Sequence, residues 1–371
     1  MNSVFTEKSA CCGCAACRAA CPAGAIIMTP DEEGFLYPSI EQDLCLDCGL
    51  CLSICPLGDD FQPTGRKAAG RFYAARHKSE EVLLKSTSGG AFTALSDAVL
   101  ASGGLVYGAD FDGRLRVVHG RAETSGQRDR MRISKYVQSD LGSVYGPLSE
   151  DLDVGRPVLF TGTPCQAAGV RSFFRDHPGR DNLYVCDLIC HSVPSPRIWE
   201  DYKEMLAGEA GGKLLKIQFR SKKYAWSRAN SNKGLMYWIE GEGEYREDDR
   251  YYELFIMKNL ICRPSCHQCR FTRVERSSDI TIADYFGIEL FTPDWYSPLG
   301  VSLIIVSSAQ GEKILRLAGE ELLLEERPAA EAVSQQKRLS APGAKPLLRD
   351  EFWRHYLEHG LAASIKFARD H

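Results

Sequence analysis

The chain has 371 residues, of which 25% are charged and 44% hydrophobic, and a formal net charge of -4. This length suits two or three globular domains. The slightly negative charge, with no basic block, argues against a general nucleic-acid binder, and no apolar run is long enough to span a bilayer. Fifteen cysteines in a chain with no secretory apolar segment predict a cytoplasmic protein whose thiolates bind metal.

Two cysteine runs near the N-terminus share the spacing C-x2-C-x2-C-x3-C-P. In bacterial ferredoxins this spacing binds two 4Fe–4S clusters, because three close thiolates bind one cluster and the fourth binds the other. A zinc site and a disulfide framework are the alternatives, but neither explains two such runs in tandem. The ligands predicted for the first cluster are Cys11, Cys14, Cys17 and Cys55. The ligands predicted for the second are Cys45, Cys48, Cys51 and Cys21.

The ferredoxin-like domain should span residues 1–60, with short strands at 25–28 and 34–37, and the turn-rich residues 61–70 indicate a linker. Beyond it, strands and helices alternate, which predicts an α/β core with a mixed, partly parallel sheet. We divide this core into residues 71–150 and 151–325, followed by a helical segment over 326–371. The expected strands are 71–75, 104–111, 114–119, 158–160, 183–189, 214–219, 235–240, 280–283 and 301–306. The expected helices start at 85–90 and end at 100, or cover 165–174, 195–206, 251–260 and 311–319.

Four cysteines of the core could form a third metal site. Cys165 and Cys190 each follow a buried strand. If those strands are parallel neighbours, both thiols lie at the carboxyl edge of the sheet, where α/β proteins build their sites. Cys266 and Cys269 form a C-x2-C pair, so these four residues could bind a third 4Fe–4S cluster or remain free structural thiols. Cys262 competes with Cys190 as the fourth ligand.

Two further cysteines are not expected to bind iron. Cys186 lies in the middle of a predicted strand, where a thiol usually acts as a small buried hydrophobe. Cys12 lies between two expected ligands and is predicted to be a spectator.

Six stretches within residues 70–290 occur together in the order typical of one known family. With them the chain resembles the beta-subunit family of coenzyme F-420 (deazaflavin) hydrogenases and dehydrogenases, in the form with an N-terminal two-cluster ferredoxin. The matching stretches are STSGGAFT (86–93), SKYVQSDLG (134–142), TGTPCQ (161–166), DLICHSVPSP (187–196), RPSCHQC (263–269) and SDITIAD (278–284).

The resemblance implies FAD and a third 4Fe–4S cluster, whose ligands would be Cys165, Cys190, Cys266 and Cys269, leaving Cys262 outside. It also implies that FAD lies against residues 86–90 and 134–136. A helix start at 86–90 would offer free N–H groups to a pyrophosphate, whereas an ordinary capped helix with packing glycines is the alternative. No GxGxxG follows a strand, so a Rossmann nicotinamide site has no support. The residues expected to contact FAD are Ser86, Thr87, Ser88, Gly89, Gly90, Ser134, Lys135 and Tyr136.

Two residues are candidates for catalysis. His191 could donate a proton beside the flavin, and a structural histidine is the alternative. Asp284 could orient His191 or a ligand, or could simply end a strand. The chain departs from the family pattern at Ser192, where glycine is frequent, and at residues 283–286, where Gly-Asp-Phe-Trp is commoner. Both departures lie near the expected active site and leave the substrate open.

These observations predict an FAD-dependent iron–sulfur oxidoreductase. Single electrons would enter through the ferredoxin-like module, pass to the third cluster and collect on FAD, which reduces an organic substrate in a two-electron step. The alternatives are a deazaflavin (coenzyme F-420) oxidoreductase that feeds a partner enzyme, and a non-catalytic relay subunit of a larger redox complex. The expected partners are ferredoxin or deazaflavin and an unidentified organic substrate, and the chain could form a homo-oligomer.

Overall fold

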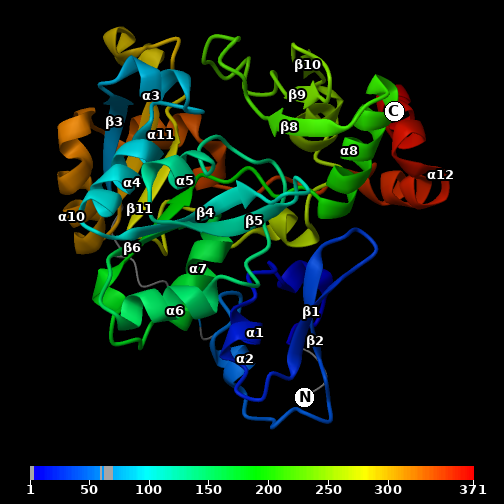
Figure 1. Cartoon of the computed structure of the whole chain (residues 1–371), viewed down its shortest axis with the longest axis horizontal. Coiled ribbons are helices and arrows are strands. Elements are labelled where there is room, and N and C mark those ends of the chain that lie inside the picture. Colours follow the sequence, from blue (N-terminus) through cyan, green and yellow to red (C-terminus); the bar gives the residue numbers. More distant parts are fainter. Residues whose placement is uncertain (1–3, 59–60, 62–69) are drawn as a thin grey trace.

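The computed structural model of the chain describes residues 4–58, 61 and 70–371. A small N-terminal module lies at one end of a larger core that is built around a mixed sheet (Figure 1). This arrangement confirms the predicted α/β class with a small N-terminal domain. The linker predicted at residues 61–70 falls almost wholly outside the described residues.

The N-terminal module is a hairpin with two short helices packed beside it. β1 (Ile26–Pro30) and β2 (Leu36–Ile40) are antiparallel, as the sequence predicted. α1 (Ala16–Ala20) and α2 (Leu50–Ser53) each begin two residues after the second cysteine of a run. Each cysteine run therefore folds into a loop and a helical turn, and the third cysteine of the run lies in that turn.

The core sheet has eight strands in the order β13-β3-β12-β11-β7-β6-β4-β5. Its centre, β4-β6-β7-β11, is parallel, and the outer strands pair antiparallel. Strands from both predicted parts of the core, 71–150 and 151–325, contribute to this one sheet. The strands are β3 (Arg71–His77), β4 (Leu105–Phe111), β5 (Val117–Ala122), β6 (Val158–Gly162), β7 (Leu183–Leu188), β11 (Ile280–Asp284), β12 (Ser302–Val306) and β13 (Leu322–Arg327).

Helices cover both faces of this sheet, because successive side chains of a strand point to opposite faces. Val106 and Leu159 belong to a buried cluster with α4 and α10. Their neighbours Leu105 and Phe160 belong to a different cluster, with α6 and α7. The helices around the sheet are α3 (Glu80–Leu84), α4 (Ala91–Ala101), α5 (Ser125–Asp129), α6 (Tyr145–Asp153), α7 (Pro164–Phe173) and α10 (Ala309–Ala318).

A second, smaller sheet stands beside the core with two long helices (Figure 1). It consists of β8 (Leu214–Gln218), β9 (Met236–Ile239) and β10 (Arg246–Glu247) in antiparallel order. α8 (Pro196–Ala210) and α12 (Arg349–Asp370) pack against it. Aromatic side chains dominate the shared core, among them Trp199, Tyr202, Phe219, Tyr251 and Phe352.

Two segments are less helical than predicted. The helix expected at 251–260 is a short α9 (Arg250–Tyr252) followed by one π-helical turn, η3 (Glu253–Met257). Within 326–371, only α11 (Ala329–Gln335) and α12 are α-helical. In the part of the chain that the structure describes, no helix combines the length and apolar character needed to cross a membrane.

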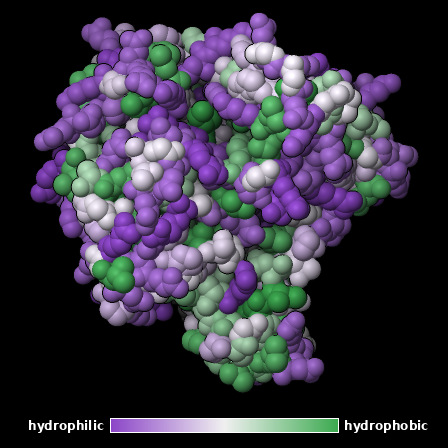
Figure 2. Space-filling model, viewed as in Figure 1, coloured by the Kyte–Doolittle hydropathy of each residue, from purple (hydrophilic) through white to green (hydrophobic). Residues whose placement is uncertain are grey.

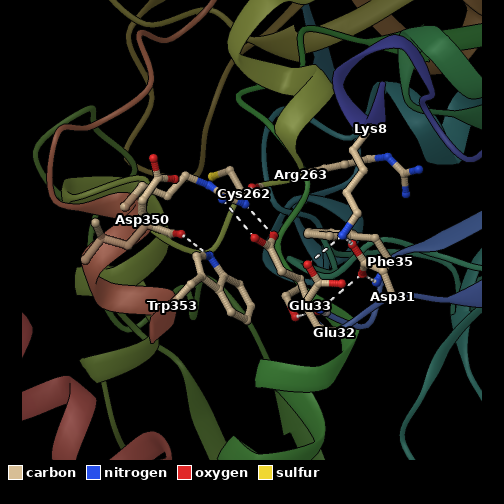
Figure 3. Close-up of polar contacts among 12 residues, drawn as sticks. Lys8, Asp31, Glu32, Glu33, Phe35, Cys262, Arg263, Asp350 and Trp353 are labelled. Carbon is tan, nitrogen blue, oxygen red and sulfur yellow. Dashed lines mark hydrogen bonds and ion pairs between the residues drawn. The ribbon is translucent and has the colours of Figure 1, made fainter. Parts of the chain in front are cut away.

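The hairpin turn of the N-terminal module is tied to the core by buried polar contacts (Figure 3). Glu33 forms a bidentate ion pair with Arg349, and Arg349 also donates to the main-chain oxygen of Cys262 at 2.8 Å. Ser195, the N-cap of α8, donates its hydroxyl to the main-chain oxygen of Glu33. The module is therefore held against the core at the segment that leads into Cys266.

Candidate functional site

Two cavities in the N-terminal module are lined by the two predicted cysteine sets. Site 1 consists of Cys11, Cys14, Cys17 and Cys55, which line one cavity together with Cys12. Site 2 consists of Cys21, Cys45, Cys48 and Cys51, which line the other. The structure thus brings each set together in the crossed arrangement that the spacing predicts.

The backbone of the two cysteine runs is preshaped for an anionic group. Gly13 and Ala15 flank the second cysteine of the first run with φ of 70° and 60°. Asp47 and Gly49 do the same in the second run, with φ of 50° and 75°. Alternation of left- and right-handed residues turns successive N–H groups into one concavity, a geometry that recurs at iron–sulfur sites. Consistent with this, the N–H of Gly13 donates to the Cys11 thiol.

The donor sets fit four-iron clusters. Each set supplies four thiols around a cavity. Among the described residues, no three His, Cys, Asp or Glu side chains converge closely enough to bind a single metal ion. Four thiolates around a cavity lined by backbone N–H groups are the ligand chemistry of a 4Fe–4S cluster.

The core cysteines meet at the edge of the main sheet. β6 pairs with β7 in parallel, as the argument for Cys165 and Cys190 requires. Both residues follow the carboxyl ends of these strands, Cys165 in the first turn of α7. The Cys190 thiol interacts electrostatically with those of Cys165, Cys266 and Cys269. We call these four residues site 3.

The alternative ligand Cys262 is bound differently. Its thiol lies 3.0 Å from Ser192 Oγ and 3.8 Å from Asn259 Oδ1. Of the site 3 thiols, only that of Cys266 is among the main influences on its pKa. Cys190 faces three thiols of the set, so the geometry favours Cys190 as the fourth ligand.

Burial dominates the electrostatics of site 3. It raises the pKa of Cys266 to about 12 and that of Cys269 to about 11, with repulsion from Cys165 as the second cause. Nearby guanidinium groups act in the opposite direction, Arg263 on Cys266 and Arg276 on Cys269. Iron must displace the thiol protons on binding, and these cations favour the thiolate form.

Sites 1 and 3 are joined by Cys12. This residue is buried, and its thiol forms side-chain hydrogen bonds with the thiols of Cys14 and Cys165. Cys12 therefore remains outside the predicted ligand sets, yet it lies between a ligand of site 1 and a ligand of site 3.

Arg263 also lies between these two sites. Its side chain is 1% exposed. Its guanidinium donates to the main-chain oxygens of Cys11 at 2.8 Å and Leu36 at 3.0 Å, and lies 3.7 Å from the Cys11 thiol. The guanidinium carbon lies 4.2 Å from the ring centre of Tyr37, which adds a cation–π contact. Sequence reasoning missed this role, because Arg263 contacts residues more than 200 positions away.

The two segments predicted to contact FAD meet each other. The N–H of Ser134 donates to Thr87 Oγ1 at 3.0 Å. The hydroxyls of Ser86 and Ser88 are used locally, donating to the main-chain oxygens of Val82 and Val301. The residue before Ser134, Ile133, has a φ of 68°. Such a conformation is rare for a β-branched residue and often marks a functional segment.

The two glycines of the first segment have a packing role. A Cβ on Gly89 would lie 2.5 Å from the Ala75 oxygen and 2.5 Å from the Ser302 nitrogen, which belong to β3 and β12. Gly90 is the N-cap of α4 with a φ of 82°. Packing alone therefore accounts for both glycines, and their contact with FAD stays a prediction.

Buried cations gather where these segments meet. Lys135 Nζ donates to the main-chain oxygens of Arg132 and Ile133, and Lys222 Nζ donates to those of Ser88 and Leu299. Burial lowers the pKa of each lysine to about 8. Tyr136 forms a side-chain hydrogen bond with Arg220. Arg220 and Lys222 were missed from the sequence, although the run Arg-Ser-Lys-Lys after a strand carried a signal.

The two catalytic candidates have separate partners. His191 Nε2 lies 2.6 Å from Asn259 Oδ1, and burial lowers the pKa of His191 to about 4. Asp284 forms an ion pair with Arg220 at 2.5 Å and accepts from Trp226 Nε1 at 2.6 Å. Asp284 therefore orients Arg220 rather than His191. A catalytic role for either residue stays a prediction.

Comparisons with known proteins bear on both parts of the chain. Residues 155–332 match the family described as the C terminus of the beta subunit of coenzyme F420 hydrogenase/dehydrogenase. Residues 10–58 match the family described as a 4Fe-4S dicluster domain. A chain of the F420-reducing [NiFe] hydrogenase complex from Methanosarcina barkeri has a similar structure, with 19% identity, a TM-score of 0.48, and coverage of 82% of this chain and 93% of that chain. No curated protein matches this chain significantly.

Proposed function

Since residues 155–332 belong to the beta-subunit family of coenzyme F420 hydrogenases and dehydrogenases, and residues 10–58 are a 4Fe–4S dicluster domain, we propose an iron–sulfur flavoenzyme function. The chain carries electrons between ferredoxin-type clusters at sites 1 and 2, a third cluster at site 3, and FAD. The FAD exchanges two electrons with an organic substrate.

One observation carries this proposal: Cys12 contacts a ligand of site 1 and a ligand of site 3. A contact of this kind gives electrons a covalent and hydrogen-bonded route from the module into the core. Site 3 follows the carboxyl ends of β6 and β7, and Asp284 ends the next strand, β11. The cluster set and the cationic segment around Arg220 therefore share one edge of the sheet.

The residues of that edge suit a flavin with a pyrophosphate. When bound, FAD would collect single electrons and release them in pairs. Lys135 and Lys222 are buried cations whose ammonium groups contact main-chain oxygens, so a phosphate nearby would stabilise their charged forms. Arg220 is held in place by Asp284 and Trp226.

The test begins with anaerobically purified protein. Iron, sulfide and released flavin are measured, and flavin bleaching is followed after adding reduced ferredoxin, reduced deazaflavin or NADH. We expect FAD, and reduction by reduced ferredoxin without a second enzyme. Reduction by deazaflavin alone would favour the deazaflavin oxidoreductase, and FMN or no flavin would contradict the proposal.

A matched pair of variants locates the flavin. Lys222→Met removes a buried cation beside Ser88 and should lower FAD affinity at least tenfold while iron stays unchanged. Lys223→Met changes the neighbouring lysine, which is exposed and pairs with Glu247 at 2.8 Å. Equal flavin content in both variants would rule out the proposed position.

A further inference from the structure

Site 2 is the iron–sulfur site closest to solvent. Cys48 is exposed, whereas Cys14 and Cys17 of site 1 are buried. The Cys51 thiol of site 2 is near enough to contribute to the raised pKa of Cys17. Electrons that arrive at site 2 can thus continue to site 1 and, through Cys12, to site 3.

Apolar side chains surround this exposed site. Leu46 is 68% exposed and Leu50 is 47% exposed, and both line the cavity of site 2. Leu44, next to Cys45, is 49% exposed. Figure 2 shows the hydrophobic colour gathered on the N-terminal module at the lower end of the molecule. Contiguous exposed apolar surface of this kind marks a binding site.

The charge around the patch has one sign. Residues 19–65 contain no lysine or arginine. Glu41 and Asp43 are exposed next to Leu44. A bound cluster with four thiolate ligands would add further negative charge. We call Glu41, Asp43, Leu44, Leu46, Cys48 and Leu50 the acidic apolar face.

We propose that the acidic apolar face docks a protein electron carrier whose redox group is framed by apolar residues and a rim of lysine and arginine. This inference rests on the proposed function, because it requires a cluster at site 2. One electron leaves the carrier and is taken up at site 2, or passes in reverse, and no proton or group moves. A patch of a few leucines suits the small, weak interfaces of electron-transfer pairs.

The charge pattern makes association depend on salt. Opposite charges on two partners accelerate their encounter at low ionic strength, and salt screens this attraction. The full-length protein with its clusters is reduced with dithionite, and its oxidation by cytochrome c, a basic carrier, is followed by stopped flow. Plastocyanin, an acidic carrier, serves as the comparison.

We expect the second-order rate with cytochrome c to fall at least tenfold between about 0.02 M and about 0.3 M salt. The rate with plastocyanin should be lower at low salt and should not fall. Glu41→Lys combined with Asp43→Lys should reverse this preference. Glu358→Lys combined with Asp370→Lys changes the same charge on exposed positions of α12, away from the module, and should leave the preference intact.

Leu46→Ser tests the apolar part of the face. It should slow electron transfer to cytochrome c at every salt concentration, whereas Leu347→Ser, at a fully exposed position of the core, should not. If the charge reversal and Leu46→Ser both leave the rates unchanged in protein with full iron, the docking proposal is wrong while the cluster assignment stands. If the module holds no iron, the proposed function and the docking proposal both fail.

Discussion

At the scale of single residues, the contacts between the module and the core depend on one buried arginine. Arg263 touches the Cys11 thiol on one side, and the N–H of Cys266 donates to its main-chain oxygen on the other. A positive charge so close to a ligand stabilises the reduced, more negative state of a bound cluster. Its position also lets it hold Cys11 and Cys266 in one fixed arrangement.

Arg263→Met should therefore lower the reduction potential of the cluster at site 1, by on the order of 100 mV for a charge at this distance in a partly buried site. Arg263→Lys keeps the charge and should restore most of the potential. A redox titration followed by electron paramagnetic resonance measures both. Arg175→Met, at an exposed position, is the control. Equal potentials in the methionine and lysine variants would mean that Arg263 acts through packing alone.

Lys135 provides a second prediction, about pH. Burial lowers the pKa of Lys135 from 10.5 to about 8. Between these values the unfolded chain holds a proton that the folded chain has released, so this lysine destabilises the fold below pH 8 and the penalty fades as pH rises toward 10.5. Lys135→Met should raise the stability of flavin-free protein at pH 7 by about 1 kcal/mol, and by less near pH 10.

Thermal unfolding of flavin-free protein at several pH values measures this difference. The exposed Lys216→Met serves as the control and should show no such trend. The same Lys135→Met variant should bind FAD more weakly. A gain in stability that does not change with pH would contradict the assignment of a buried charge.

At the scale of elements, the hairpin of the module depends on a turn that only glycine fits. Gly34 lies between β1 and β2 with a φ of 81°, and a Cβ there would lie 2.5 Å from the Arg197 Cβ of α8. Gly24 has a similar φ of 64° but nothing within 4 Å of its Cβ position. The two glycines thus separate backbone strain from docking.

Gly34→Ala should cost more stability than Gly24→Ala, because the first adds a clash to the strain of about 1–2 kcal/mol that both share. Hydrogen exchange over residues 31–40 should accelerate in Gly34→Ala and change little in Gly24→Ala. Similar exchange in the two variants would show that the turn does not hold the module against α8.

At the scale of the whole molecule, three cysteine sets in two parts of the chain lie in series. Sites 1 and 2 belong to a module that repeats one backbone pattern twice. Site 3 is assembled from residues that follow β6, β7 and the small sheet. Loss of the third set should leave the first two intact, since none of their ligands belongs to the core.

Wild-type protein should therefore contain about twelve iron atoms per chain, and Cys266→Ala about eight. Cys262→Ala should retain about twelve, because its thiol contacts Ser192 and Asn259. Iron analysis and resonance spectra of anaerobic samples check both. Loss of iron in Cys262→Ala together with full iron in Cys190→Ala would overturn the ligand assignment.

The sequence by itself determined what depends on neighbours along the chain. The cysteine spacing predicted both crossed sets of the module, and the alternation of strands and helices predicted the parallel centre of the sheet that places Cys165 beside Cys190. Only the tertiary structure decided how these parts connect. Cys12 meets Cys165, Arg263 meets Cys11, and Lys222 meets Ser88 across more than 100 residues of chain. Such contacts arise from packing of whole elements, so no periodicity or local spacing records them.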